Sequence, residues 1–396
     1  MSPTTLLWLI TGCLMLQPLS TDLYQPSLPH LAAYFSSTPA AVQQTLSLFV
    51  IGFGTAQLVS GPLSDRYGRH PILMGGLATY LVASIACALA PSMFLLIAAR
   101  FVQATGCCTA VVVARAIIRD AYTPADGARM IAKASSLLSM APLFGPIVGG
   151  YLQINFGWRA AFGVHTLFCA LLAWAAWRWL EETNVRKDPA ATRLSCLARG
   201  YVQIASTPAF WAYTLPGALS YSAIFVFISG SSFVLIQVLG VPTEYFGYCF
   251  AFGVLGYLAG TIVCRRLLGR IGLGPTLTAG TTLSLLGGLS YAALTLAGVH
   301  HWTVVLGCQF MIMCAHGINF PCAQAGAVAP FPQQAGAAAA LLGFFTMVAA
   351  LLVGTWVGFS YDGTLVPMAL TSAGVGILLF ASARMLARHH LVPEEA

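Results

Sequence analysis

The chain alternates long apolar runs with short polar segments, and the runs recur at membrane-spanning length. A helix that crosses the hydrocarbon core of a bilayer needs about 20 mostly apolar residues. The runs that meet this length lie at 5–29, 41–62, 71–90, 92–114, 131–152, 159–179, 208–237, 244–264, 272–297, 302–324, 335–359 and 364–386. This pattern predicts an all-α polytopic membrane protein with twelve transmembrane helices. It also predicts an N-terminal six-helix bundle at 1–179, an exposed connector at 180–207 and a C-terminal six-helix bundle at 208–396.

The composition excludes a soluble domain, because only 7% of the residues are charged and 58% are hydrophobic, whereas charged residues make up about 25% of soluble proteins. The 11 cysteines are scattered through apolar runs, so we interpret them as small buried residues rather than as disulfides or zinc ligands. The first apolar run lacks a basic leader, which predicts that it is retained as a helix. Phosphate-binding, zinc-protease and serine-hydrolase motifs are absent from the sequence, and we expect neither an enzyme nor a cofactor or metal.

The basic residues predict the orientation of the protein in the membrane. With the predicted spans, 16 of the 18 Lys and Arg residues fall on one face, and only Arg100 and Arg159 lie elsewhere. Short loops rich in Lys and Arg stay on the cytoplasmic side. Both termini are therefore expected in the cytoplasm, and the net charge of +7 indicates topology rather than binding to nucleic acid.

A carboxylate lies inside the first apolar run, in the stretch QPLSTDLYQPSLP at 17–29. An aspartate at the centre of a membrane helix costs roughly 2.5–3.5 kcal/mol on insertion scales, and such residues usually handle ions or substrate. Asp22 shares one helical stripe with other polar residues, including Thr21 and Gln25. The sequence predicts an inward-facing functional carboxylate; the alternative is a buried aspartate that only pins two helices together.

The loop after the second run reads GPLSDRYGRH at 61–70 and resembles the signature of the major facilitator superfamily, with His70 at a position that is usually Lys or Arg. In that family the loop is a conformational latch rather than a transport site. The latch residues that the resemblance implies are Gly61, Asp65, Arg66, Gly68 and Arg69, with Arg119 and Asp120 as their partners. For the last two residues, solvated positive-inside charges are the alternative.

Two further stretches resemble motifs of the same superfamily. RFVQATG at 100–106 places Arg100 and Gln103 on one face of the fourth helix. APLFGPIVGG at 141–150 resembles the motif of drug:proton antiporters, with Ala141 where a glycine is usual. The residues that carry this antiporter motif are Gly145, Pro146, Gly149 and Gly150. The alternative is a close-packing face of the kind found in any membrane bundle.

The sequence most resembles the bicyclomycin and chloramphenicol resistance branch, Bcr/CflA, at 20–29, 114–122, 180–183 and 227–235. The resemblance implies that Asp22 is protonated and contacts substrate, and that Arg100 contributes to the same cavity; we expect Arg100 to be the counter-charge of Asp22. Aromatic and polar residues of the second half are further candidates, although ordinary packing is their alternative. The candidate substrate-binding residues are Asp22, Tyr24, Gln25, Arg100, Gln103, Tyr221, Phe225, His316 and Asn319.

These patterns and the resemblance together predict proton-coupled efflux of small lipophilic drugs across a bacterial inner membrane by a monomeric, alternating-access carrier with the major facilitator fold. The partners are then lipid, protons and a small molecule. An uptake symporter for a metabolite would use the same fold and the same carboxylate. A membrane receptor or scaffold that does not transport is the other alternative.

Overall fold

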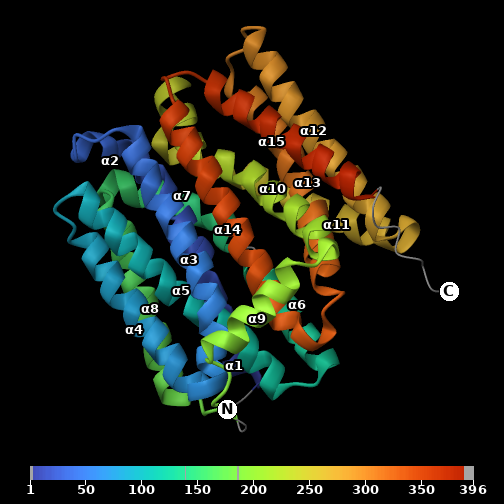
Figure 1. Cartoon of the computed structure of the whole chain (residues 1–396). Helices are drawn as coiled ribbons and strands as arrows, with labels where there is room; N and C mark the ends of the chain where they lie inside the picture. The colour runs from blue at the N-terminus through green and yellow to red at the C-terminus, as the bar shows by residue number, and fades with distance from the viewer. Residues whose placement is uncertain (1–2, 139, 185–186, 388–396) are drawn as a thin grey trace. The chain divides into compact units, whose positions relative to one another are not determined.

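The computed structural model describes residues 3–138, 140–184 and 187–387, and the regular elements of this part of the chain are all helical (Figure 1). The main helices are α1 (Pro3–Asp22), α2 (Leu28–Tyr34), α3 (Pro39–Tyr67), α4 (Arg69–Ala88), α5 (Met93–Ala121), α6 (Pro124–Leu138), α7 (Met140–Phe156), α8 (Arg159–Trp179), α9 (Leu194–Ala205), α10 (Pro208–Ser232), α11 (Thr243–Ile271), α12 (Leu273–Leu296), α13 (Trp302–Val328), α14 (Ala335–Ser360) and α15 (Val366–Ala387).

Among the described residues, eleven helical spans are long and apolar enough to cross a membrane. The predicted run at 131–152 falls on α6 and α7, on either side of residue 139, which lies outside the described residues. The prediction of an all-α polytopic membrane protein is confirmed. One part of the cysteine prediction is wrong: Cys196 is exposed, because it lies on α9 in the polar connector.

Local sequence signals explain where the spanning helices begin and end. Thr38 caps α3 by accepting a hydrogen bond from the Ala41 N–H (3.3 Å), and Ser92 caps α5 through the Leu95 N–H (3.4 Å). Each cap satisfies a backbone donor that the first helical turn leaves free. α3 ends at Tyr67, and the next residue, Gly68, has a φ of 111°, which favours a residue without a Cβ.

The first span is a broken helix, and Asp22 lies at the break. α1 ends at Asp22, a 3₁₀ turn covers Gln25–Ser27, and α2 follows directly. An unbroken helix would need a backbone N–H four residues after Asp22, but that residue is Pro26, which has none. The span predicted at 5–29 is confirmed as the helical span Thr4–Tyr34, and the proline explains the interruption within it.

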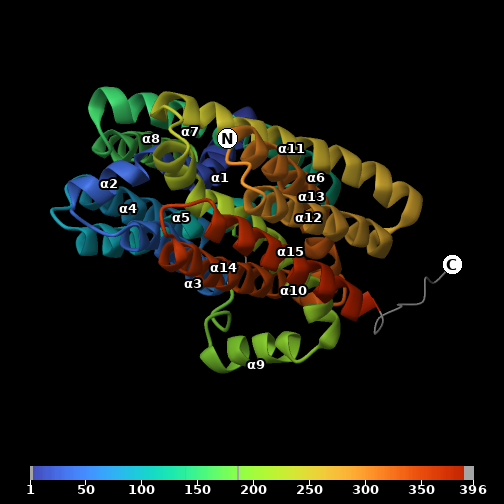
Figure 2. The same ribbon diagram turned by 90° about the horizontal axis from the view of Figure 1, so that it is seen from above.

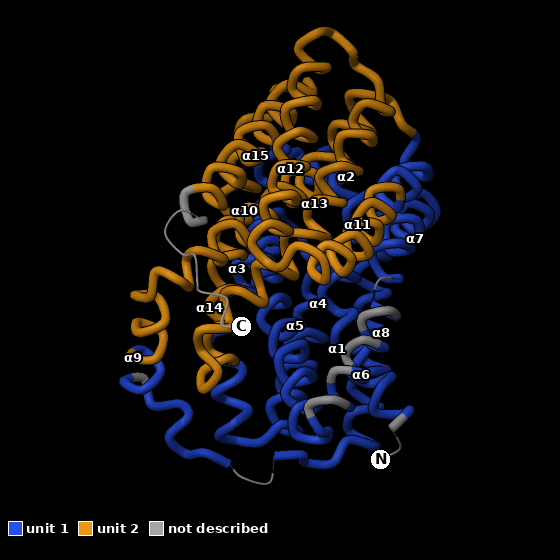
Figure 3. Tube along the Cα trace, turned by 90° about the vertical axis from the view of Figure 1, so that its right-hand side faces the viewer, with its two compact units in different colours: residues 1–198, 242–251 blue, residues 199–241, 252–396 orange. Residues whose placement is uncertain are grey.

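The chain divides into two compact units, coloured separately in Figure 3. Unit 1 contains Met1–Ala198 and Pro242–Ala251; unit 2 contains Arg199–Val241 and Phe252–Ala396. In unit 1, α5 packs against α3, α4 and α1, and α8 packs against α4 (Figures 1 and 2). In unit 2, α10 packs against α13, α14 and α15, while α12 packs against α13 and α15. Each unit thus buries its own set of helix faces.

Candidate functional site

Asp22 is buried at the end of α1 and is held by neutral groups. Its side chain is 5% exposed, and Oδ1 accepts hydrogen bonds from Thr21 Oγ1 (2.8 Å) and Gln25 Nε2 (3.2 Å). No cationic side chain of the described residues forms an ion pair with it. A carboxylate with only neutral partners can gain or lose a proton without breaking an ion pair. Tyr24 is fully buried beside it and donates its hydroxyl to Thr45 Oγ1 (3.1 Å).

The glycines of α7 form the surface on which the Asp22 segment packs. A Cβ placed on Gly145 would lie 3.3 Å from the Asp22 Cβ, and one on Gly149 would lie 2.9 Å from the Leu23 carbonyl carbon. Only glycine at 149 lets the two backbones approach so closely. Gly150 faces the Thr243 backbone instead, in the first turn of α11, which belongs to unit 1. Pro146 is buried within the same helix.

Arg100 of α5 is fully buried within unit 1, and its guanidinium contacts neutral oxygens and aromatic rings. One terminal nitrogen donates to Gln103 Oε1 (2.6 Å) and the other to the Ser20 carbonyl (3.0 Å). The guanidinium carbon lies 4.2 Å from the ring centroid of Phe49, and the rings of Tyr24 and Phe162 are 5.1 and 5.9 Å away. These contacts replace part of the hydration that a buried cation loses.

The expected pairing of Arg100 with Asp22 is not seen. Arg100 reaches the Ser20 carbonyl, two residues before Asp22, while the described partners of the carboxylate are Thr21 and Gln25. His165 of α8, which the sequence analysis missed, donates from Nε2 to the adjacent carbonyl of Leu19 (3.0 Å). Two consecutive carbonyls of α1 are therefore held from α5 and α8. Arg100 thus positions the backbone before Asp22 instead of neutralising its charge.

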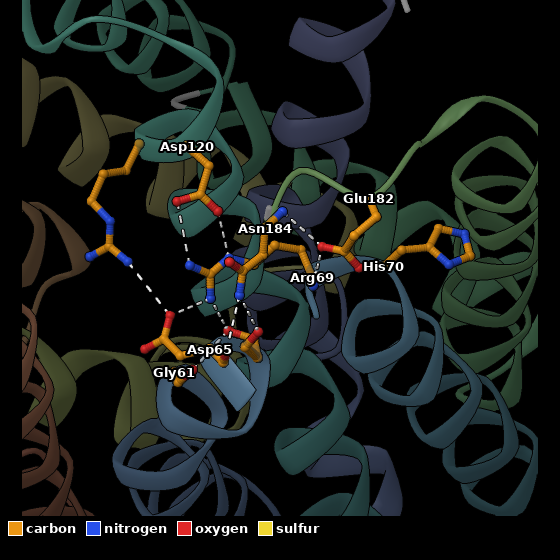
Figure 4. A network of polar contacts seen from close by, with 9 residues as sticks. Gly61, Asp65, Arg69, His70, Asp120, Glu182 and Asn184 are labelled. Atoms are coloured by element: carbon orange, nitrogen blue, oxygen red, sulfur yellow. Dashed lines mark hydrogen bonds and ion pairs between the residues drawn. The ribbon is translucent and has the colours of Figure 1, made fainter. Parts of the chain in front are cut away.

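The 61–70 loop is organised around Arg69, the first residue of α4 (Figure 4). Its side chain is 4% exposed and forms ion pairs with Asp65 (2.5 Å) and Asp120 (2.7 Å). It also donates to Ser64 Oγ (2.7 Å). Arg69 thereby connects the end of α3, the start of α4 and the end of α5.

The other predicted latch residues are more peripheral. Arg66 bonds Thr192 Oγ1 in the connector (2.5 Å) rather than Asp65. The exposed Arg119 approaches Asp65 only to 3.9 Å. Gly61 lies inside α3, half-buried, with Val112 as the nearest side chain, 3.9 Å from where its Cβ would be. The tight part of the network therefore involves Asp65, Arg69 and Asp120.

The connector caps both helix ends of this loop, a contact that the sequence analysis missed (Figure 4). Glu182 accepts hydrogen bonds from the backbone N–H groups of Arg69 (2.8 Å) and His70 (3.2 Å) at the start of α4. Asn184 donates its side-chain amide to the Asp65 carbonyl (3.0 Å) at the end of α3. Burial raises the pKa of the Glu182 carboxyl, but backbone N–H groups of Asn184, Arg69 and His70 outweigh it and hold the pKa below its ordinary value.

The predicted substrate-binding residues of unit 2 lie in two separate places. Tyr221 and Phe225 of α10 stack with ring centroids 6.1 Å apart, and the His316 ring lies 6.1 Å from Tyr221. Asn319 is fully buried and faces α12, where its amide oxygen would clash with any Cβ on Gly280. The spacing of three predicted that His316 and Asn319 share a face of one helix; both lie on α13, but their side chains contact different helices.

Comparison with known proteins identifies the family. A model of the Major Facilitator Superfamily matches residues 10–355. The chain belongs to this superfamily. The membership confirms the prediction of a transporter fold rather than an enzyme, and it agrees with the loop and antiporter motifs found in the sequence.

Relatives within the superfamily support the predicted resistance branch. The chain is 28% identical to a bicyclomycin resistance protein homolog of Haemophilus influenzae, over 90% of this chain and 89% of the relative. It is 31% identical to a chloramphenicol resistance protein of Pseudomonas aeruginosa, over 65% and 59%. Multidrug resistance protein D of Escherichia coli is 29% identical over 82% and 81%.

Several solved transporters have the same fold as this chain, although their sequence identity to it is low. A D-xylose-proton symporter superposes with a TM-score of 0.74 at 14% identity, covering 97% of both chains. A bacterial homolog of the human lysosomal transporter Spinster, in an inward-facing occupied conformation, gives a TM-score of 0.73 at 16% identity over 99% and 98%. These similarities concern the fold alone.

Proposed function

We propose that this protein exports small lipophilic drugs across the bacterial inner membrane in exchange for protons, as a monomer without a cofactor. Both termini would lie in the cytoplasm. The observation that carries the proposal is the setting of Asp22, a buried carboxylate at a break in the first span whose hydrogen-bond partners are neutral. The names of the resistance relatives support drugs as the substrate class.

In the proposed cycle, deprotonated Asp22 holds substrate taken from the cytoplasmic side. Protonation from the periplasmic side weakens that hold, and the proton is then carried inward. Moving one charge across 100 mV is worth about 2.3 kcal/mol, which is enough for modest uphill export. The halves alternate access by rocking, and the Arg69 network at the 61–70 loop stabilises one of the two states.

Transport in proteoliposomes with an imposed pH gradient tests the direction of coupling. We expect a gradient that drives protons into the vesicle lumen to drive drug out of it. Accumulation of substrate in the direction of proton flow would favour the uptake symporter instead. Absence of transport by inserted protein, with either gradient and any of the drugs named for the relatives, would favour a receptor or scaffold.

A further inference from the structure

Two cysteines of unit 2 face each other where α11 packs against α13. The Sγ atoms of Cys264 on α11 and Cys322 on α13 lie 3.8 Å apart. Both side chains are buried, with exposed fractions of 2% and 0%. Because 58 positions of sequence separate them, no spacing motif could reveal the pair. The fold therefore brings together two thiols that the sequence alone presents only as small buried residues.

Backbone contact between the two helices holds the pair together. A Cβ on Gly260, one turn before the first thiol, would overlap the carbonyl group of Cys314. A Cβ on Gly317, which precedes the second thiol on α13, would overlap the carbonyl oxygen of Tyr257. Glycine at these positions lets the two helices approach closely. The two sulfur atoms therefore stay within reach of a single bridging atom.

The surroundings of the two thiols are apolar. Leu277 of α12 and Ile318 of α13 complete their buried cluster, and the partly buried hydrophobic residues packed against it are Tyr213, Leu268, Leu273 and Leu283. The Cys264 thiol also contacts the Ile318 carbonyl oxygen at 3.6 Å. A net charge in such a cluster would be costly, because no opposite charge compensates for the lost hydration. A ligand that joins the two sulfurs must therefore leave a neutral product.

The number of ligands and the charge balance select the kind of metal. Within the described ranges of the chain, no three or more His, Cys, Asp or Glu side chains gather as a metal site, whereas zinc takes four ligands in its structural sites. Thiolates prefer soft metal ions. Copper(I) held by two thiolates would form an anion, but mercury(II) accepts two thiolates in a linear, neutral complex. Mercury(II) is therefore the ion that suits two thiols in an apolar cluster.

We propose that Cys264 and Cys322 form a two-thiol site for mercury(II), a soft, two-coordinate metal ion. With mercuric chloride, two Hg–S bonds form while two S–H and two Hg–Cl bonds break. Two protons and two chloride ions leave to water, and no oxidation state changes. The site lies in unit 2 and goes beyond the proposed export function, because it uses neither Asp22 nor the proton gradient.

Mercury retention by the purified full chain tests this site. Mercuric chloride is added, glutathione is titrated in as a competing thiol, and elemental mass spectrometry measures the mercury that each chain keeps. We expect Cys264→Ser and Cys322→Ser each to lose one mercury per chain, at a glutathione concentration about 100-fold lower than the wild type requires, because the second sulfur acts at high effective concentration. The double variant should lose no more mercury than either single variant.

Cys308→Ser is the matched control, since Cys308 is another buried cysteine of α13, and it should retain mercury as the wild type does. Twice the loss in the double variant, no loss in the single variants, or an equal loss in the control would overturn the inference. Peptide mapping of the wild-type adduct needs no variant, so it decides the question even if the serine variants do not fold. It should find the Cys264 and Cys322 peptides joined through mercury; mercury on other peptides alone would contradict the site.

Discussion

At the level of single residues, Asp22 and Arg100 differ in how their charges are satisfied. Arg100 is enclosed by three aromatic rings and two oxygen acceptors, so its charge is fixed in place. Asp22 has two neutral donors, so its protonation can change while the surrounding contacts persist. This difference supports the proposal that Asp22 couples transport to protons, while Arg100 positions the backbone.

Arg100→Ala should destabilise the protein by about 2–4 kcal/mol, because it opens a cavity between aromatic rings and leaves Gln103 and the Ser20 carbonyl without their donor. Thermal unfolding in detergent, at one scan rate, measures the loss. Arg159→Ala is the matched control: Arg159 also lies over an aromatic ring, that of Trp158 (4.3 Å), but is exposed, and its loss should have little effect. Equal effects of the two substitutions would contradict a positioning role for Arg100.

Charged residues inside apolar runs are rare, which is why the sequence alone was enough to select Asp22 and Arg100 as candidates. The same reasoning could not find His165, because a lone histidine in an apolar run has no partner that spacing reveals. Its bond to the Leu19 carbonyl depends on how α8 packs against α1. Likewise, the sequence could not show that Arg100 bonds to the Ser20 carbonyl instead of pairing with Asp22, because that contact depends on how α5 packs against α1.

At the level of elements, the position of the end of α1 depends on its packing against α7. The helix ends at the 61–70 loop are capped by residues of the connector. The proline that interrupts the first span was visible in the sequence, but a run of apolar residues does not by itself predict a break. The glycines of α7 were also visible, whereas their partner, the Asp22 segment, was not. Element lengths were therefore more predictable than the contacts between elements.

Gly149→Ala should displace the Asp22 segment, since the new methyl would meet the Leu23 carbonyl group. We expect a destabilisation of about 1–3 kcal/mol, typical of overpacking, and a reduced dependence of export on the pH gradient. Gly163→Ala on α8 is the control, because a Cβ there would have no neighbour within 4 Å. Gradient-driven export by Gly149→Ala at the wild-type level would show that α7 does not position Asp22.

Glu182→Gln should weaken the cap on α4 by roughly 0.5–1 kcal/mol, a small value because Glu182 is exposed and screened by water. The pKa of Glu182 is lowered in the folded protein, so the charged cap stabilises the fold above the unfolded-state pKa. This stabilisation is lost as the pH falls through the folded-state pKa. The difference in unfolding temperature between wild type and Glu182→Gln should therefore shrink below about pH 4.5.

Glu181→Gln provides the reference for that comparison, because Glu181 is the exposed neighbour of Glu182 and takes no part in the cap. A gap between wild type and Glu182→Gln that persists unchanged at acid pH would contradict a charged cap.

At the level of the whole molecule, the two sets of apolar runs and the basic loops gave the class of protein and a predicted orientation. Both patterns extend over many residues, so one misassigned residue changes neither the predicted class nor the predicted orientation. The sequence did not define the finer architecture, such as the broken first span or the exposed position of Cys196. The orientation stays a prediction that labelling can test.

Cys196 offers a native probe of that orientation, since it is exposed on α9 while the other cysteines are buried or half-buried. A membrane-impermeant maleimide should label it in inside-out vesicles but not in intact spheroplasts. Cys196→Ser should abolish the label, and adding His300→Cys to that variant should restore labelling in spheroplasts. Labelling of Cys196 in intact spheroplasts would place the connector on the periplasmic face.

The account depends most on Asp22 as the proton-coupling group, and the decisive measurement is drug export by Asp22→Asn in proteoliposomes across a series of imposed pH gradients. The substitution is nearly isosteric and removes a charge that is costly in lipid, so the protein should insert with unchanged or higher stability. We predict that its transport no longer responds to the pH gradient. Wild-type export rates with an unchanged dependence on that gradient would contradict the account.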